Sequence, residues 1–247
     1  MYLITKDEEH NIGRVLESVR WMDEIVVLDS GSTDRTADIA RSLGARVVVS
    51  DFRGFVEQKN AAMKLCTGEW VFNIDADEEV TPELRRSIED VVYNANDSGA
   101  DVFSVARRTW YMNRWIRHCG WYPEYRTRLS RKGCAEWRGE ILHESLEGDT
   151  PPVALTGDLL HRPYEDMGEH ITTIRRYTEL WAARESGKGR RASITDMAFR
   201  PVFRFVKMYV IRAGFLDGIP GFVASVMGAW YVFMKYTRLY EVSGKSE

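Results

Sequence analysis

The stretch Glu24-Ile-Val-Val-Leu-Asp-Ser-Gly-Ser-Thr-Asp34 decides the fold class. Its first five residues form an apolar, β-branched run that is too hydrophobic for a surface strand, and Asp29 follows directly. Ser32 and Thr33 then open a helical pattern that stops at Gly44, a residue suited to the left-handed conformation that ends helices. A buried strand that passes through a polar turn into a helix is the repeating unit of a parallel α/β sheet.

The same alternation runs through the first hundred residues. Further strands are expected at Tyr2–Thr5, Arg46–Val49, Trp70–Ile74 and Val102–Ala106. Helices are expected after Asn11, which can cap the first, at Phe55–Cys66, and from Thr81-Pro82-Glu83. Apolar strands separated by helices predict an α/β fold whose parallel sheet is covered on both faces.

The pattern changes after residue 106. Residues 107–165 read as a mixed region, in which Arg131-Lys132-Gly133 predicts a hairpin turn between strands at Tyr125–Leu129 and Cys134–Trp137. Residues 166–247 read as helical, with a polar break at Glu185–Arg191. We therefore divide the chain into an α/β half (1–106), a mixed half that completes a cleft of the same domain (107–165) and a basic helical extension (166–247).

Composition sets limits on the class of protein. The chain has 247 residues, 44% hydrophobic and 29% charged, which is typical of a globular protein. The three cysteines Cys66, Cys119 and Cys134 form neither a metal-ligand pattern nor a disulfide framework, so we expect a reducing cytoplasm. Lys6-Asp7-Glu8-Glu9 interrupts any apolar run at the start, so no signal peptide is expected.

Charge is distributed unevenly. Residues 1–170 contain 21 Lys and Arg against 31 Asp and Glu, a net charge of −10, whereas residues 171–247 contain 13 against 6, a net charge of +7. A basic region on an acidic body predicts an anionic surface as the partner of that region alone. The acidic body argues against nucleic acid as a partner.

Two acidic loops follow predicted strands. Asp29 is the first residue after its strand, and Asp75-Ala76-Asp77-Glu78-Glu79 follows another. Ligands of parallel α/β sheets bind beyond the carboxyl ends of the strands. Asp75 and Asp77, two residues apart, favour one side of an extended chain and suit a divalent cation, whereas Glu78 and Glu79 are assigned to a solvated turn. A capped turn without a ligand is the alternative for Asp29.

These loops carry a resemblance. Ile-Thr-Lys-Asp-Glu-Glu at 4–9, Val-Val-Leu-Asp-Ser-Gly-Ser-Thr-Asp at 26–34 and Asn-Ile-Asp-Ala-Asp-Glu at 73–78 are similar to the motifs of family 2 glycosyltransferases. Further similarity lies at Gln58-Lys59-Asn60, Gly68-Glu69-Trp70, His143-Glu144, Gly214-Phe-Leu-Asp-Gly218 and Lys235-Tyr236. Together they resemble the branch containing bacterial lipopolysaccharide-core β-1,4-glucosyltransferases, although Asp7 stands where that family usually has Asn.

The resemblance implies a GT-A fold and inverting transfer of a hexose from a UDP-sugar, glucose first, with Mg²⁺ or Mn²⁺ as cofactor. It implies that Asp29 contacts the uracil or ribose, that Asp77 holds the metal, and that Asp75 contacts the ribose or the water shell of the metal. Donor-binding residues by the same resemblance are Thr5, Asp7, Glu8, Asp29, Lys59, Asp75, Ala76, Asp77, Arg126 and Arg128. Residues 1–106 become the nucleotide-sugar half and residues 107–165 the acceptor side.

An inverting displacement needs one general base to deprotonate the acceptor hydroxyl. Glu144, in Ile-Leu-His-Glu-Ser-Leu, is the first choice, followed by Glu124 and then Asp166. His161 could complete the metal shell, or it could be a histidine bonded to backbone at a strand end. His143 is a weaker metal candidate.

Other residues keep two interpretations. Arg126 and Arg128 alternate along a strand, so both are expected on one face, where they could bind donor phosphate or an anionic acceptor. The aromatic residues of the mixed region could form a platform for acceptor sugars or an ordinary core. They are Trp110, Tyr111, Trp115, Trp121 and Tyr122.

Residues 200–240 intersperse cations with bulky apolar side chains, a pattern that favours helices lying in a membrane interface. The longest uncharged stretch, Gly218–Met234, is at the short end for crossing a bilayer. We expect a peripheral protein on the cytoplasmic face of the membrane that extends a lipid-linked glycan. A catalytically silent nucleotide-binding scaffold and a nucleotidyltransferase are the alternatives.

Overall fold

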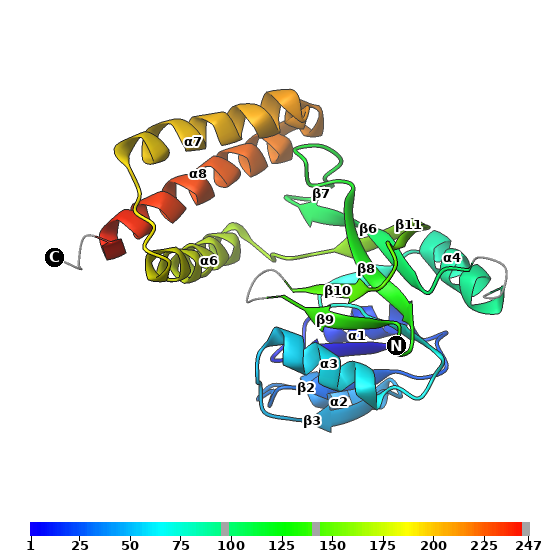
Figure 1. Ribbon diagram of the computed structural model, residues 1–247. Coiled ribbons are helices and arrows are strands. Elements are labelled where there is room, and N and C mark those ends of the chain that lie inside the picture. Colours follow the sequence, from blue (N-terminus) through cyan, green and yellow to red (C-terminus); the bar gives the residue numbers. More distant parts are fainter. Residues whose placement is uncertain (95–98, 140–143, 244–247) are drawn as a thin grey trace. The chain divides into compact units, whose positions relative to one another are not determined.

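The computed structural model describes residues 1–94, 99–139 and 144–243. The chain forms two compact units (Figure 1). The first comprises Met1–Arg107 and Glu124–His161, and the second comprises Arg108–Pro123 and Arg162–Glu247. The sequence-based division at residues 106 and 165 differs from this grouping at two places, because residues 108–123 and 162–165 group with the C-terminal helices.

The first unit opens with the predicted parallel strands. β1 (Tyr2–Thr5), β2 (Val26–Asp29) and β3 (Arg46–Val49) pair in parallel in that order. The helices between and after them are α1 (Ile12–Ser18), α2 (Thr36–Ser42) and α3 (Phe55–Leu65). A parallel bridge between Tyr2 and Asn73 places the chain that leaves β4 (Trp70–Phe72) beside β1. The α/β class predicted from the sequence is confirmed.

A second, mixed sheet follows, in the order β4, β8, β6, β11 and β5. Its further strands are β5 (Glu78–Val80), β6 (Val102–Tyr111), β8 (Glu124–Arg131) and β11 (Val153–His161), with α4 (Pro82–Tyr93) between β5 and β6. The predicted hairpin between β8 and the next strand is wrong. A turn does form at Arg131-Lys132-Gly133, but β8 pairs with β4 and β6, while β9 (Ala135–Arg138) pairs with β10 (Ser145–Gly148).

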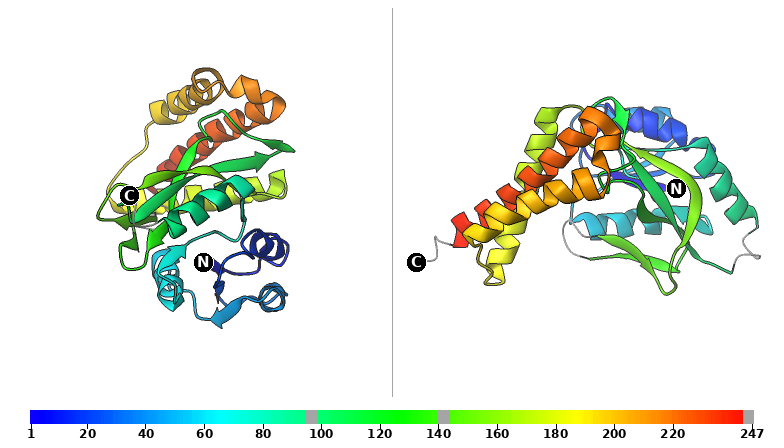
Figure 2. Two further views of the ribbon diagram at one scale, coloured as in Figure 1. Left: turned by 90° about the vertical axis from the view of Figure 1, so that its right-hand side faces the viewer. Right: turned by 90° about the horizontal axis from the view of Figure 1, so that it is seen from above.

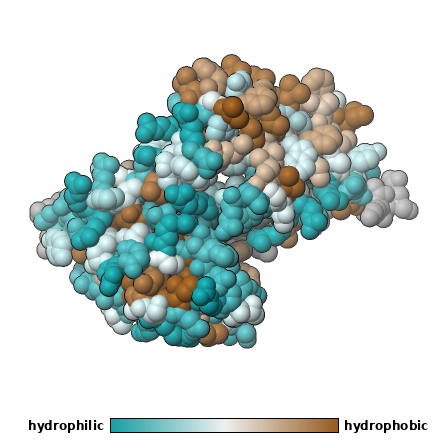
Figure 3. All heavy atoms as spheres, turned by 180° about the vertical axis from the view of Figure 1, so that it is seen from behind, coloured by the Kyte–Doolittle hydropathy of each residue, from teal (hydrophilic) through white to brown (hydrophobic). Residues whose placement is uncertain are grey.

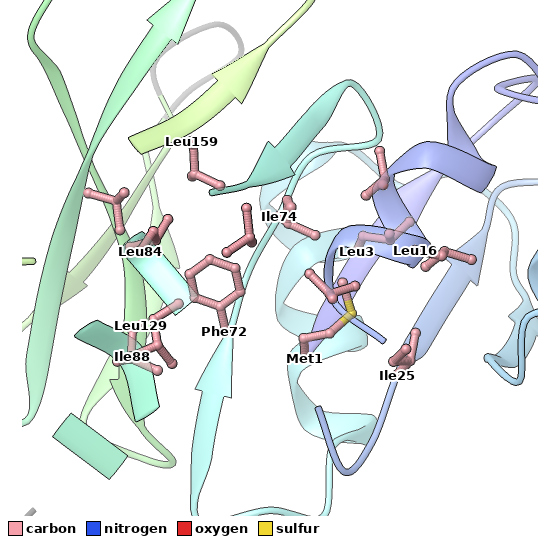
Figure 4. Close-up of a cluster of buried hydrophobic side chains, with 14 of the residues drawn as sticks. Met1, Leu3, Leu16, Ile25, Phe72, Ile74, Leu84, Ile88, Leu129 and Leu159 are labelled. Carbon is pink, nitrogen blue, oxygen red and sulfur yellow. The ribbon is translucent and has the colours of Figure 1, made fainter. Parts of the chain in front are cut away.

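Apolar side chains from both sheets form the main core of this unit (Figure 4). Leu3, Phe72, Ile74, Leu129 and Leu159 are all at most 3% exposed. Burying a side chain of this size contributes roughly 1.5–3 kcal/mol to the stability of the fold. This core therefore holds in place the strands whose ends carry the polar loops.

Of the two helix caps predicted from the sequence, one forms and one does not. The Thr81 hydroxyl accepts the N–H of Leu84 at 3.3 Å, as expected of a helix cap. Asn11 precedes α1, but its side chain caps nothing there and instead donates to Glu8 at 2.9 Å. The expected cap fails because the amide oxygen of Asn11, the atom that would accept an N–H of the first turn, instead accepts the Arg14 guanidinium at 2.8 Å.

The second unit is mostly helical. Its elements are β7 (Arg114–Trp115), α6 (Met167–Gly187), α7 (Ile194–Val206), the π-helical η1 (Lys207–Ile211), the 3₁₀ turn η2 (Gly214–Asp217) and α8 (Gly218–Ser243). α7 runs along α8 in each view (Figures 1 and 2). The residues Gly214–Ser243 are long and apolar enough to cross a membrane by length and composition alone.

Candidate active site

The first loop of the site follows β2 in the first unit. Asp29 is only 2% exposed, and its carboxylate accepts the N–H groups of Gly31 at 3.2 Å and Ser32 at 3.0 Å. Gly31 has φ +78°, a conformation that favours glycine. Asp29 therefore shapes the turn after β2. Its contact with a nucleotide stays a prediction.

A second loop, after β1, is bonded to the first. The N–H of Asp7 donates to the Ser32 hydroxyl at 2.9 Å, the Asp7 carboxylate accepts the N–H of Thr33 at 2.7 Å, and the N–H of Glu8 donates to the Thr36 hydroxyl at 2.7 Å. These bonds preorganise both loops at the carboxyl edge of the parallel sheet.

Thr5 lies between the two loops and is the register partner of Asp29. Its hydroxyl is buried and has no hydrogen-bond partner among the described residues. A buried hydroxyl is normally bonded, and an unpaired one is costly. This hydroxyl is therefore available to a ligand at the strand ends.

A buried ionic network supports the third loop, which carries Asp75-Ala76-Asp77. The guanidinium of Arg128, 3% exposed, contacts Asp75 at 2.5 Å, Glu78 at 2.7 Å and the amide oxygen of Asn73. On the other side of Asp75, the Lys59 Nζ atom lies 3.1 Å from its second oxygen. Both carboxylate oxygens of Asp75 are thus held by cations.

The charge state of Asp75 follows from these neighbours. Burial by itself would raise the pKa of the carboxyl, but Arg128 and Lys59 outweigh it and hold the pKa well below its usual range. Lys59 is also fixed by Trp137, with its Nζ atom 4.3 Å from the centre of that ring. Asp75 therefore stays ionised and positions Lys59 at the base of the loop.

Glu78 does not lie in a solvated turn, and that expectation is wrong. Its side chain is completely buried, it accepts the N–H of Asp75 at 3.0 Å, and the Arg107 guanidinium lies 3.6 Å away. Two arginines compensate the buried carboxylate, as burial of a charge requires. Glu79 is half-buried and pairs with Arg14 at 2.8 Å.

Arg126 and Arg128 are not equivalent, contrary to the expectation from their alternation. The register between β6 and β8 shifts between Phe103 and Ser104, which pair with Leu129 and Thr127. Arg128 is the extra residue of this β-bulge. A bulge breaks the two-residue period, so Arg128 is buried while Arg126 is exposed and pairs with Glu124.

Asp77 and His161 are the two residues expected to bind metal. The structure brings them together, with the Nε2 atom of His161 3.2 Å from a carboxylate oxygen of Asp77. His161 ends β11, where it pairs in register with Glu78, and the backbone of Ala76 is buried between the two aspartates.

Their fit to a divalent cation can be tested on the residues present. Mn²⁺ accepts both an imidazole nitrogen and a carboxylate oxygen as ligands. Mg²⁺ is usually bound by one or two carboxylates together with diphosphate oxygens and water. No group of three His, Cys, Asp or Glu side chains able to hold a metal ion occurs within residues 1–94, 99–139 and 144–243. The donor set therefore fits a cation that shares its coordination with a substrate.

Glu144 lies next to this loop. One of its carboxylate oxygens is 4.0 Å from the Lys59 Nζ atom, and its side chain is 21% exposed. The alternatives for a general base are occupied elsewhere. Burial raises the pKa of Glu124, but Arg107 and Arg126 outweigh it and lower that pKa, while Asp166 caps α6 by accepting the N–H of Glu169 at 2.9 Å. His143 is outside the described residues.

Other predicted residues have structural partners. Gln58 donates to the Ser30 hydroxyl at 3.2 Å, and Asn60 exchanges two hydrogen bonds with the backbone of Trp137, each 2.9 Å long. The aromatic group divides within the second unit. Tyr111 and Trp121 pack in its core, whereas Trp110 and Trp115 hold the Arg162 guanidinium 4.9 and 5.0 Å from their rings.

Sequence reasoning missed Asn73, Glu78 and Arg107 as members of the network around Arg128 and Asp75. They follow β4, begin β5 and lie on β6, and they belong together only because the second sheet joins these strands in the order β4, β8, β6, β11 and β5. The one available indication in the sequence was Arg107, a charged residue in the largely apolar strand β6.

The geometry defines a class of protein. A parallel sheet with an Asp-x-Asp loop at its carboxyl edge, continued by an antiparallel sheet, is the GT-A arrangement of nucleotide-sugar-dependent transferases. A family model described as glycosyl transferase family 2 matches residues 2–144, and the chain belongs to this family. It is a family 2 glycosyltransferase.

Relatives extend along the whole chain. The chain is 31% identical to an uncharacterized glycosyltransferase of Rickettsia typhi over 99% of this chain and 87% of the relative. It is 30% identical to the lipopolysaccharide core biosynthesis glycosyltransferase LpsC of Rhizobium meliloti, over 97% and 91%. A solved structure of glucosyl-3-phosphoglycerate synthase from Mycobacterium tuberculosis with Mn²⁺ and UDP is 27% identical over 44% of this chain and 42% of that one, with a TM-score of 0.36.

Proposed function

We propose that this family 2 glycosyltransferase transfers a hexose, glucose in the first instance, from a UDP-sugar to a lipid-linked glycan. The acceptor we infer is a lipopolysaccharide core at the cytoplasmic face of the membrane. The observation that carries the donor half of the proposal is the Asp77–His161 pair, whose Nε2 and carboxylate oxygen atoms lie 3.2 Å apart. The similarity to LpsC, named for lipopolysaccharide core biosynthesis, supports the acceptor half.

The donor site is assembled at the carboxyl ends of β1, β2 and β4. The Thr5 hydroxyl and the loop shaped by Asp29 face the nucleoside in this proposal, and Lys59 supplies positive charge near the diphosphate. Asp77 and His161 would hold Mg²⁺ or Mn²⁺, which supplies positive charge where the leaving diphosphate becomes more negative. Asp75 keeps Lys59 in place because its own carboxylate stays ionised.

Glu144 is the proposed general base. It accepts the proton of the acceptor hydroxyl while that oxygen bonds to the anomeric carbon and the bond from this carbon to UDP breaks. UDP leaves with the electron pair, so a single displacement inverts the anomeric centre. The Lys59 Nζ atom, 4.0 Å from a carboxylate oxygen of Glu144, lies beside this proposed base.

The metal assignment is tested by titrating UDP into the purified full chain by calorimetry, with and without Mn²⁺. We expect binding that depends on Mn²⁺ in the natural protein, loss of that dependence in Asp77→Asn, and its retention in the control Glu79→Gln. Equal UDP affinity in Asp77→Asn and the natural protein would overturn the assignment.

The base is tested with Glu144→Gln and the nearby exposed control Glu147→Gln. We expect Glu144→Gln to bind UDP with Mn²⁺ normally and to lose at least about a hundredfold in glucose transfer, the usual contribution of a general base. Full transfer by Glu144→Gln would refute this role. Binding of UDP without any transfer by the natural protein would favour the silent scaffold, and release of pyrophosphate would identify a nucleotidyltransferase.

A further inference from the structure

Large exposed hydrophobic side chains gather in the second unit, on α7 and the turn that follows it. Phe199, Val202, Phe203, Val206 and Val210 are between 39% and 71% exposed. They are spaced three or four residues apart, which puts them on one face of the helix. None of the residues of α7 is buried.

The apolar surface continues around the turn into α8. Ile211, Phe215, Leu216 and Ile219 are each at least half exposed. Together with the four residues of α7 and Val210 of η1 they form what we call the apolar face, and Figure 3 shows hydrophobic side chains gathered on the surface of this unit. Soluble monomers rarely expose so many large hydrophobic side chains side by side, which marks an interaction surface.

The opposite side of α7 and η1 packs on α8. Phe205 lies 6.0 Å from Phe222, and Met208 is 1% exposed. A Cβ on Gly228 would lie 2.4 Å from the Met208 sulfur, so the absence of a side chain at Gly228 leaves room for Met208 against α8. One side of α7 and η1 is therefore packed against α8, and the opposite side carries the exposed apolar face.

Cations border the apolar face. Residues 197–240 contain six Lys and Arg and one carboxylate, Asp217, which is 1% exposed. Two of the six pair with acids outside this range, Arg200 with Asp196 and Arg238 with Glu179 and Glu241. Among residues 1–94, 99–139 and 144–243, no ion pair occupies Arg204, Lys207 or Arg212. Arg204 and Lys207 follow Val202 and Phe203 along the helix and lie on the neighbouring side of α7.

We propose that the apolar face docks on an anionic lipid bilayer, with α7 and the start of α8 lying in the plane of the interface. Apolar side chains would enter the boundary between headgroups and acyl chains, and the unpaired cations would meet the lipid phosphates. This inference rests on the proposed function in one respect, because an enzyme with a lipid-linked acceptor must reach that acceptor at the membrane surface. A protein partner gives no comparable reason for three cations that have no ion pair among the described residues.

The same contacts distinguish lying on the bilayer from crossing it. The candidate span includes η2, a 3₁₀ turn, and Gly218 at φ +65°, both of which break the helix at its apolar end. At its other end Tyr236 is 7% exposed and its ring packs 5.4 Å from Trp181 of α6. Crossing would require α8 to give up these contacts, whereas interfacial docking keeps them.

Co-sedimentation of the full chain with vesicles tests the proposal. Vesicles of phosphatidylcholine alone are compared with vesicles in which roughly one lipid in three is phosphatidylglycerol. We expect binding to the anionic vesicles only, weakened as salt rises from about 0.1 M to about 1 M because the Debye length falls from about 10 Å to about 3 Å. The variants Phe199→Ser/Phe203→Ser and Arg204→Gln/Lys207→Gln should each bind at least tenfold more weakly.

Val49→Ser/Phe52→Ser is the matched control, because these side chains are similarly exposed but lie in the first unit. It should bind vesicles like the natural protein. Circular dichroism and the UDP titration show whether each variant is folded, and they separate the two proposals. UDP binding without vesicle binding overturns the docking surface alone. Self-association that Phe199→Ser/Phe203→Ser abolishes, with no vesicle binding, would assign the face to a second copy instead.

Discussion

Replacing Arg128 by Met tests the buried network that supports the Asp-x-Asp loop. The guanidinium is 3% exposed and contacts Asp75, Glu78 and Asn73. Methionine fills similar space but leaves a fully buried Glu78 with only the more distant Arg107, 3.6 Å away. Removing one partner of a buried ion pair costs about 3–5 kcal/mol, a large part of the roughly 5–15 kcal/mol that stabilises a typical domain.

The assay is urea unfolding followed by tryptophan fluorescence, with Trp70 and Trp137 as reporters in the first unit. With a slope of about 1–3 kcal/mol per molar urea, a loss of this size lowers the midpoint by roughly 1–5 M. The control is Arg126→Met on the same strand. Its side chain is 44% exposed and paired only with Glu124, so the loss should stay below about 1 kcal/mol.

The effect also depends on pH, with a defined sign. The pKa of Asp75 is well below its usual range in the folded protein, because Arg128 and Lys59 outweigh burial. A depressed pKa stabilises the fold above the unfolded value of about 3.9 and ceases to do so as the pH falls through the folded pKa. Arg128→Met removes much of that depression, so its deficit relative to the natural protein should shrink below about pH 4. A loss no larger than that of Arg126→Met at pH 7 would refute the reasoning.

Two further substitutions test packing in the first unit. In Tyr2→Phe, the indole N–H of Trp137 loses the buried hydroxyl that it meets at 2.7 Å, so we expect about 1–3 kcal/mol less stability in urea; an unchanged midpoint would contradict this. Gly157→Ala puts a Cβ 2.3 Å from the backbone nitrogen of Leu84 at φ +93°, whereas Gly133→Ala meets open space at φ +87°. The first should lower the thermal midpoint far more than the second, which carries only the roughly 1–2 kcal/mol of left-handed strain, and equal shifts would show that the close approach is unimportant.

Local sequence was sufficient for the parallel half of the fold. Strands at Tyr2–Thr5 and Arg46–Val49 form as predicted, because β-branched apolar runs between turn signals have no better local alternative. It was equally sufficient for the Thr81 cap, where the bonding partners lie three residues apart. The approach of Asp77 to His161 was expected from the family resemblance, and the geometry agrees with it.

The tertiary structure alone decided which acids are buried and which arginine is the counter-ion. Nothing in Asp75-Ala-Asp-Glu-Glu79 distinguishes Glu78 from its neighbours, yet it is the one that two arginines from other strands neutralise. Arg126 and Arg128 read as equals until a bulge shifts the register between them. Strand pairing joins residues about fifty positions apart, so a local period cannot report it, and a one-residue shift moves each following side chain to the opposite face.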